Sequence, residues 1–151
     1  MSPARRVVVV LAGIAALVLS ARLGWAACTV SATSVSFGTY NVFATTPLDS
    51  TGSVTYRCGN DRDIQVLLDR GGAGSFQRRM LKGSEALQYN LYLDPARVTI
   101  WGDGTGGTSV YVDRNPPNNR DVTVTIYGRV PAGQDVSAGS YTNLVTVTIL
   151  F

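Results

Sequence analysis

From residue 27 onward the apolar residues follow a period of two between polar, Gly- and Pro-rich turns, and no stretch carries the roughly 3.6-residue stripe of an amphipathic helix over three turns. This period predicts an all-β chain, because successive side chains of a strand face opposite sides of its sheet. Turn-forming segments separate the predicted strands, which cover residues 35–37, 52–58, 64–69, 87–93, 97–101, 122–130 and 144–151. About seven short strands favour a two-sheet sandwich of immunoglobulin type, with a flattened barrel as the alternative.

The last predicted strand differs from the others because it is apolar and uncharged to its end. Val145, Val147, Ile149 and Phe151 form one apolar stripe, and the sequence of residues 144–151 contains no charged side chain. A long apolar strand with an open edge pairs readily with other chains, so this one must be paired or covered. Two interpretations stay open: the strand lies centrally in its sheet, or another polypeptide fills the neighbouring edge.

The N-terminus has the features of an export signal. Two arginines precede an unbroken apolar run over residues 7–19, which as a helix would span roughly 20 Å and so falls short of a hydrocarbon core of about 30 Å. Gly24 and Ala26 supply small residues for cleavage directly after Ala26. We therefore predict a signal peptide at residues 1–26, no membrane span after its removal, and one mature domain at residues 27–151.

The chain contains two cysteines, Cys28 and Cys58. In an exported protein each has only the other as a partner within the chain, which predicts a disulfide between them. Closing a loop of about 30 residues stabilises a fold by roughly 3 to 4 kcal/mol in the chain-entropy model. Cys28 also raises the alternative of a lipoprotein signal, although Trp25 stands where such a signal carries a small aliphatic residue.

Charge and composition argue against several classes of function. The chain has 13 basic residues, 10 acidic residues and no histidine. Removal of residues 1–26 takes away three arginines and no acidic residue, so the mature net charge is zero and no nucleic-acid partner is expected. Histidine is the commonest general base and zinc ligand, and two cysteines by themselves do not fill a metal site. We expect no enzyme, no cofactor, no metal site and no catalytic residue.

Eight short strings, spread over the whole mature chain, point to one family. They are Ala27-Cys28-Thr29-Val30-Ser31, Phe37-Gly38 with Tyr40, Arg79-Met80, residues 87–94 (LQYNLYLD), 101–104 (WGDG) and 127–134 (YGRVPAGQ), Gly139-Ser140-Tyr141, and the closing residues 145–148 (VTVT). In this order and spacing they resemble the spore coat U domain, which is shared by bacterial coat proteins and by subunits of archaic chaperone-usher pili.

The resemblance implies an incomplete immunoglobulin-like β-sandwich of about six to seven strands in Greek-key order, with one edge completed by a donor strand. An inserted strand satisfies unpaired backbone groups and an open apolar slot together. The implied partners are a periplasmic chaperone, an outer-membrane usher and other pilus or coat subunits. The implied route leads through the periplasm to the cell surface, a fimbrium or an extracellular coat. Residues Val145, Val147, Ile149 and Phe151 would line the acceptor groove or hold the chaperone.

The chain departs from the family pattern at its mature N-terminus. A polymerising subunit carries a donor extension of about ten residues before its first cysteine, whereas the predicted cleavage leaves only Ala27 before Cys28. The chain is therefore expected to accept a strand without donating one, as a fibre-end or coat subunit. Cleavage after Ala21 or earlier would restore a short extension.

Two other functions remain open. The first is a tip adhesin that binds a glycan or an abiotic surface, for which Trp101 is a possible surface contact; a core position for Trp101 at a strand end is the competing interpretation. The second is a monomeric periplasmic protein with a complete fold, which would unfold cooperatively without any partner.

Overall fold

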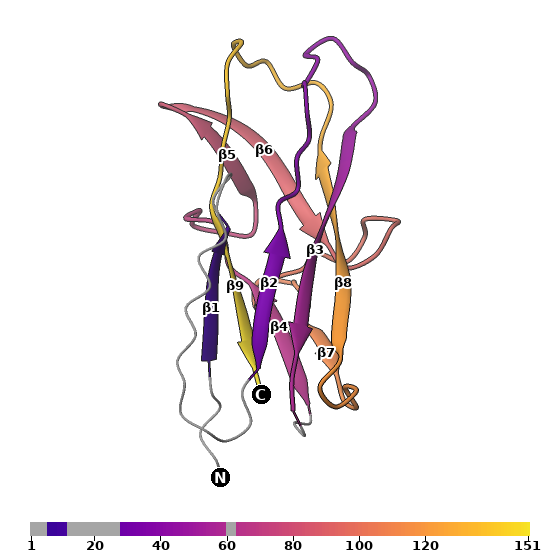
Figure 1. Cartoon of the computed structure of the whole chain (residues 1–151). Coiled ribbons are helices and arrows are strands. Elements are labelled where there is room, and N and C mark those ends of the chain that lie inside the picture. The colour runs from indigo at the N-terminus through magenta and orange to yellow at the C-terminus, as the bar shows by residue number, and fades with distance from the viewer. Residues whose placement is uncertain (1–5, 12–27, 60–62) are drawn as a thin grey trace.

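The computed structural model of the chain describes residues 6–11, 28–59 and 63–151 (Figure 1). Within these residues the chain forms strands and no helix. The strands are β1 (Arg6–Leu11), β2 (Thr29–Thr33), β3 (Leu48–Arg57), β4 (Ile64–Leu68), β5 (Arg78–Lys82), β6 (Glu85–Tyr92), β7 (Tyr111–Asp113), β8 (Asp121–Val130) and β9 (Val145–Leu150). The described part of the chain accordingly holds no helix long and apolar enough to cross a membrane.

The strands form two sheets that pack face to face (Figure 1). One sheet has the order β1-β9-β4-β7 and the other the order β2-β3-β8-β6-β5, and neighbouring strands within each sheet are antiparallel. Many neighbours are distant in sequence, as in β3 and β8, where Leu48 is the register partner of Val130. The described strands form two separate open sheets, ending in β1 and β7 and in β2 and β5, so the molecule is the predicted immunoglobulin-like sandwich and not the alternative barrel.

The core lies between the two sheets and is filled by alternate residues of their strands. In β4 and β9 every second residue is buried, as the period of two predicts. The large apolar side chains that are fully buried include Tyr56, Ile64, Leu68, Ile126 and Ile149 from the strands of both sheets, and Trp101 from the chain between β6 and β7. Each apolar side chain of this size contributes about 1.5–3 kcal/mol by leaving water, so the alternating stripes hold the two layers together.

The predicted disulfide between Cys28 and Cys58 is present. It joins the residue before β2 to the residue after β3, next to the register pair Thr29 and Arg57. Both cysteines are buried in the core cluster. The bridge therefore fixes the start of β2 against the end of its antiparallel neighbour.

The chain between β2 and β3 lies against the inner face of the larger sheet, and two glycines make the room for it. A Cβ atom at Gly128 would stand 2.7 Å from side-chain atoms of Val35 and Phe37. A Cβ atom at Gly52 would stand 2.7 Å from the carbonyl oxygen of Thr33 and 2.8 Å from Val35. Because β3 and β8 carry no side chain at these positions, the segment after β2 packs directly on their backbones.

Two of the predicted strands are not formed. Residues 35–37 lie outside any strand, because the segment leaves the edge of its sheet after Thr33 and turns onto the inner face. Residues 97–101 begin inside a turn. Arg97 has a φ of 59°, and the Asp94 carboxylate accepts hydrogen bonds from the backbone N–H groups of Val98 and Thr99. Only isolated bridges form at Ile100 and Trp101.

Three strands within residues 27–151 were not predicted. β2 lies at Thr29–Thr33, directly after Cys28, where the short sequence TVSAT holds little apolar signal. β7 has only 3 residues. β5 has the sequence RRMLK, in which the buried residue is Arg78, so its inward position appears polar in the sequence.

Candidate functional site

The candidate site is the sandwich edge where β9 of one sheet faces β2 of the other. The apolar stripe predicted for the last strand points into the core here: Val145 is 5% exposed, Val147 and Ile149 are 0% exposed, and Phe151 packs partly buried against the same cluster. On one side β9 pairs with β4, through register partners such as Val66 and Ile149. Its other side faces β1.

The backbone of β9 alternates between its two neighbours. Asp69, which follows β4, donates its N–H to the carbonyl oxygen of Thr146 at 3.0 Å, and the Thr146 N–H donates to Asp69 Oδ1 at 3.0 Å. In an antiparallel ladder the polar backbone groups of successive residues point to opposite sides. The N–H and C=O groups of Val145, Val147 and Ile149 therefore face the side where β1 lies.

β1 fills this edge along the length of β9. Six register pairs join the two strands, from Arg6 opposite Leu150 to Leu11 opposite Val145. β1 also contacts β2, so that it closes the gap between the edges of the two sheets. In the full chain β9 is thus a central strand, as one of the two interpretations stated. β1, however, lies inside the predicted signal peptide, and in residues 27–151 alone β9 would be an edge strand.

A groove of about 960 Å³ continues this edge beyond the end of β1. Its two walls are the segments that prolong β2 and precede β9, residues 34–42 and 136–143. Figure 1 shows both segments running to the end of the molecule opposite the C-terminus. The base of the groove is apolar and comes from the inner face of the larger sheet, with residues Met80, Leu87, Tyr89, Leu91, Ile126 and Val130.

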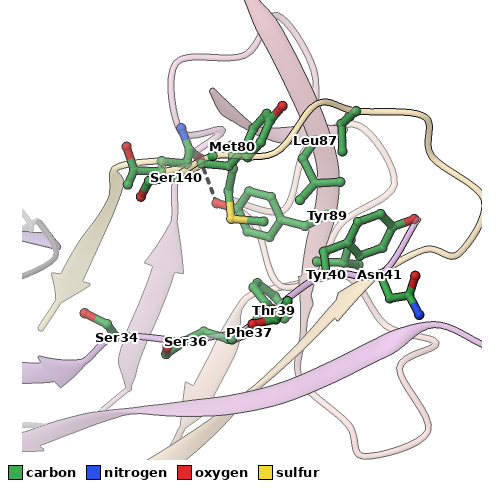
Figure 2. A pocket seen from close by; sticks show the side chains of 18 of the residues that line it. Ser34, Ser36, Phe37, Thr39, Tyr40, Asn41, Met80, Leu87, Tyr89 and Ser140 are labelled. Atoms are coloured by element: carbon green, nitrogen blue, oxygen red, sulfur yellow. Dashed lines mark hydrogen bonds between the residues drawn. The ribbon is translucent and has the colours of Figure 1, made fainter. Parts of the chain in front are cut away.

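Aromatic side chains crowd the groove between its two walls. Figure 2 shows the side chains of Phe37, Tyr40 and Tyr89 between the wall that carries Ser34 to Asn41 and the wall that carries Ser140. Phe37 and Tyr89 meet edge to face, with ring centroids 5.8 Å apart. The Tyr89 hydroxyl donates to Asn143 Oδ1 at 2.7 Å, and burial raises the pKa of Tyr89 to about 12, so it remains a neutral donor.

The walls of the groove carry polar backbone groups that are not used in the sheets. In the described part of the chain, residues 35–40 and 137–141 make no backbone–backbone hydrogen bond. Side chains serve only some of their carbonyl groups: Ser50 donates to Ser36 O at 2.5 Å, Tyr141 to Ser137 O at 2.9 Å and Lys82 to Ala138 O at 2.8 Å. An apolar groove between two such walls offers an extended peptide both burial and backbone partners.

Both walls are tied to the larger sheet by side chains. Tyr40 donates its hydroxyl to Pro131 O at 3.0 Å and accepts the Gln134 N–H at 2.9 Å, which holds the first wall to the chain after β8. Gln134 in turn accepts the Gln88 N–H of β6 at 2.7 Å. These hydrogen bonds anchor the first wall to β6 and to the chain after β8.

The second wall is held by a polar cluster that joins it to the β5–β6 hairpin. We call this cluster the Glu85 clamp and define it as Lys82 and Glu85 of the hairpin with Ser137 and Tyr141 of the wall. Glu85 accepts hydrogen bonds from the hydroxyls of Ser137 (2.6 Å) and Tyr141, and forms an ion pair with Lys82 at 3.3 Å. Lys82 donates to Ser137 Oγ and to Ala138 O. The hydrogen bonds from Ser137 and Tyr141, followed by Lys82, lower the pKa of Glu85 to about 2.

The site contains the residues that the sequence predicted and, in addition, two wall segments that it did not. The predicted residues Val145, Val147, Ile149 and Phe151 form the core side of the open edge, and their role as acceptor residues stays a prediction. The walls at residues 34–42 and 136–143 were not singled out as site residues. Their only signal was that Phe37-Gly38 with Tyr40 and Gly139-Ser140-Tyr141 belong to the strings that carried the family resemblance.

The possible surface contact at Trp101 is corrected by the structure. Trp101 is 0% exposed, and its indole N–H donates to Val66 O at 2.9 Å inside the core. A ring in this position presents no face to a glycan or a surface, so the core interpretation holds. Among the described residues, no group of three His, Cys, Asp or Glu side chains could hold a metal ion.

Comparison with known proteins gives a consistent result. Residues 14–148 match the family model of the Spore Coat Protein U domain. The chain is 33% identical over 132 residues to Protein U of Myxococcus xanthus, covering 78% of this chain and 72% of that protein.

Among solved structures, the chain is similar to a chain in the CsuC–CsuE chaperone–tip adhesion subunit pre-assembly complex from archaic chaperone-usher Csu pili of Acinetobacter baumannii. The TM-score is 0.59 at 22% identity over 84% of the present chain. The chain spans only 40% of that solved chain, and the likeness concerns the fold.

Proposed function

The chain belongs to the Spore Coat Protein U domain family, and on that premise we propose that it is a structural subunit of a surface fimbria of the archaic chaperone-usher type, or of a related secreted coat. Its work is assembly through strand pairing and apolar burial, without a catalytic step. The mature domain is residues 27–151, and the edge between β9 and β2 is its acceptor site for a donor strand.

The observation that carries the proposal is the strand that stands at this edge. A segment outside the proposed mature domain, β1, supplies the outer neighbour of β9 along its whole length. Without it, the backbone groups of Val145, Val147 and Ile149 lose their partners, and the apolar core between β9 and β2 opens to water. Exposed apolar core surface costs about 25 cal/mol per Å², and a long uncharged strand with an unpaired row of N–H and C=O groups is a template for pairing with another chain. Another chain is therefore expected to supply the missing strand.

The proposed partners follow from this open edge. A periplasmic chaperone would fill it first, an outer-membrane usher would receive the complex, and another pilus or coat subunit would then supply the lasting donor strand. A donor longer than β1 would continue into the groove between residues 34–42 and 136–143. The chain itself would accept a strand without donating one, because the predicted cleavage leaves a single residue before Cys28.

The proposal is tested by giving the mature domain a strand of its own. Leu150 of β9 is the register partner of Arg6, so a short turn after Phe151 followed by a copy of residues 6–11 would form a hairpin with β9. We expect residues 27–151 alone to aggregate when exported to the periplasm, and either this fusion or coexpression with a chaperone of the chaperone-usher class to restore a soluble product.

The matched control for this test is the same fusion with proline at the position that corresponds to Val9, whose register partner is Val147. Proline removes an N–H group that would pair with β9, so this fusion should aggregate like the unmodified domain. Equal yield and equal thermal stability of residues 27–151 with and without an added strand would refute the proposal and support the self-complete monomer.

A further inference from the structure

We propose that residues Arg6–Leu11, inside the predicted signal peptide, are the chain's own placeholder strand, which closes the open edge of β9 until the signal peptide is removed. The inference rests on the proposed function for the meaning of that edge. It adds an occupant that belongs to the same chain, and it assigns to proteolytic processing the role of opening the site.

The backbone geometry supports the placeholder strand. β1 runs antiparallel to β9 without a bulge, and its Val7, Val9 and Leu11 are the register partners of Ile149, Val147 and Val145. These are the β9 residues whose backbone groups point away from β4. The pairs that join β1 to β9 at these positions are therefore the hydrogen-bonded pairs of the ladder.

The composition of the segment supports a strand as well. An export signal requires an apolar run, and leucine and alanine meet this requirement as well as valine does. This run nevertheless begins with four consecutive valines at positions 7–10. β-Branched residues favour strands over helices because their side chains have few allowed rotamers in a helix. The first part of the apolar run thus meets the demands of export and of pairing with β9, and residues 7–11 carry no charge.

The chain between β1 and β2 is long enough for this arrangement. β1 ends beside Val145, and β2 begins at Thr29, beside Arg57. Residues 12–27 can span up to about 50 Å when extended, whereas β1 itself is only about 20 Å long. The connection therefore allows the strand to reach its place while it is still attached to the domain.

The consequence concerns the order of events in assembly. With residues 6–11 in place, β9 is a central strand, and the unprocessed chain has no free edge there to offer a donor. Cleavage after Ala26 disconnects the placeholder strand from the domain. Its effective concentration at the edge then falls to its concentration in solution, and a partner strand replaces it.

The test uses the full chain, residues 1–151, refolded under oxidising conditions with the signal peptide retained. Two variants are compared with it, V9P and V10P. Val9 pairs with Val147, so proline at position 9 removes an N–H group that faces β9. The N–H group at position 10 faces away from β9, so V10P introduces the same ring without this loss.

Amide hydrogen exchange in β9 reports the outcome. We expect the Val147 amide, which faces β1, to exchange at least about tenfold faster in V9P than in the wild type and in V10P. The Thr148 amide, which faces β4, should stay equally protected in all three chains and thereby show that the rest of the fold is intact. Equally fast exchange of Val147 in the wild type and in V9P overturns the inference.

A second measurement needs no variant and remains valid if V9P does not fold. In the wild-type full chain, a nuclear Overhauser effect between the amide protons of Val9 and Val147 is expected, because the two residues form a hydrogen-bonded antiparallel pair. Its absence also overturns the inference.

The two proposals fail separately. If β1 does not pair with β9 but the C-terminal strand fusion rescues residues 27–151, the proposed function stands and the placeholder strand is refuted. If β1 pairs as expected but the domain needs no added strand once the signal peptide is gone, the proposed function is refuted instead.

Discussion

At the scale of single residues, Arg78 is the least expected member of the core. Its side chain is 0% exposed, and its guanidinium donates to neutral oxygens: Asp69 O at 2.7 and 2.9 Å, Asn90 Oδ1 at 2.9 Å and Trp101 O at 2.8 Å. The guanidinium also lies over the Phe76 ring, 5.2 Å from its centroid. Desolvation lowers the pKa of Arg78 to about 10, which keeps it charged at neutral pH. Arg78 thus joins β5 to β6 and to the chain around Asp69 and Trp101.

Replacement of Arg78 by alanine is expected to lower the free energy of unfolding by about 2–4 kcal/mol, because it leaves a cavity and buried oxygens without donors. The neighbouring Arg79 is exposed and supplies the matched control, for which we expect a change within about 0.5 kcal/mol. Urea denaturation of the full chain measures both. Similar losses in the two variants would contradict a special role for the buried guanidinium.

At the scale of elements, the Glu85 clamp connects the β5–β6 hairpin to the chain that leads into β9. Leu81 and Thr142 exchange backbone hydrogen bonds of 2.8 and 3.1 Å beside it, so side chains and backbone together hold this wall. The ionised carboxylate of Glu85 is the common acceptor of the clamp. Protonation of Glu85 would weaken every contact that it makes to Ser137, Tyr141 and Lys82.

The clamp predicts a defined pH dependence. The pKa of Glu85 falls from an ordinary value of 4.5 to about 2 in the folded chain, so the stability that it contributes is fully present above pH 4.5 and is lost as the pH falls through about 2. The Glu85→Gln variant lacks this contribution at every pH. The difference in urea midpoint between the wild type and this variant should therefore shrink from pH 5 to pH 2, whereas a constant difference would contradict the clamp.

At the scale of the whole molecule, the disulfide and the strand at the β9 edge act on different states. The bridge between Cys28 and Cys58 closes a loop with a sequence separation of 30 residues, which restricts the unfolded chain. The strand at the edge completes the folded sandwich. Loss of the disulfide or loss of the strand beside β9 should each favour the unfolded chain. The disulfide lies within residues 28–58, whereas the strand beside β9 comes from a separate segment, β1.

The Cys28→Ser and Cys58→Ser variants of the full chain are expected to lose the same stability, roughly 3–4 kcal/mol each. The double variant should lose no more than either single variant, because both remove one bridge. Thermal or chemical denaturation under oxidising conditions measures all three. Clearly unequal single variants, or additive losses, would show that one cysteine has a separate role.

Much of the fold could be predicted because its signal is local. The period of two located β3, β4, β6, β8 and β9 to within a few residues, and the apolar stripe of the last strand identified Val145, Val147 and Ile149 as inward-facing. The prediction failed where a local pattern carries no such signal. In β5 the inward residue is Arg78, and after β2 the apolar residues Val35 and Phe37 pack on the sheet without joining it.

The sequence by itself determined that the chain is an all-β sandwich with one disulfide and an uncharged last strand, since the period of the apolar residues and the number of cysteines are local properties. Only the tertiary structure decided what stands beside β9, which segments wall the groove, and how Arg78 is accommodated. Strand pairing and burial join residues far apart in the chain, such as Leu48 with Val130 or Val9 with Val147. No short window of sequence contains both members of such a pair.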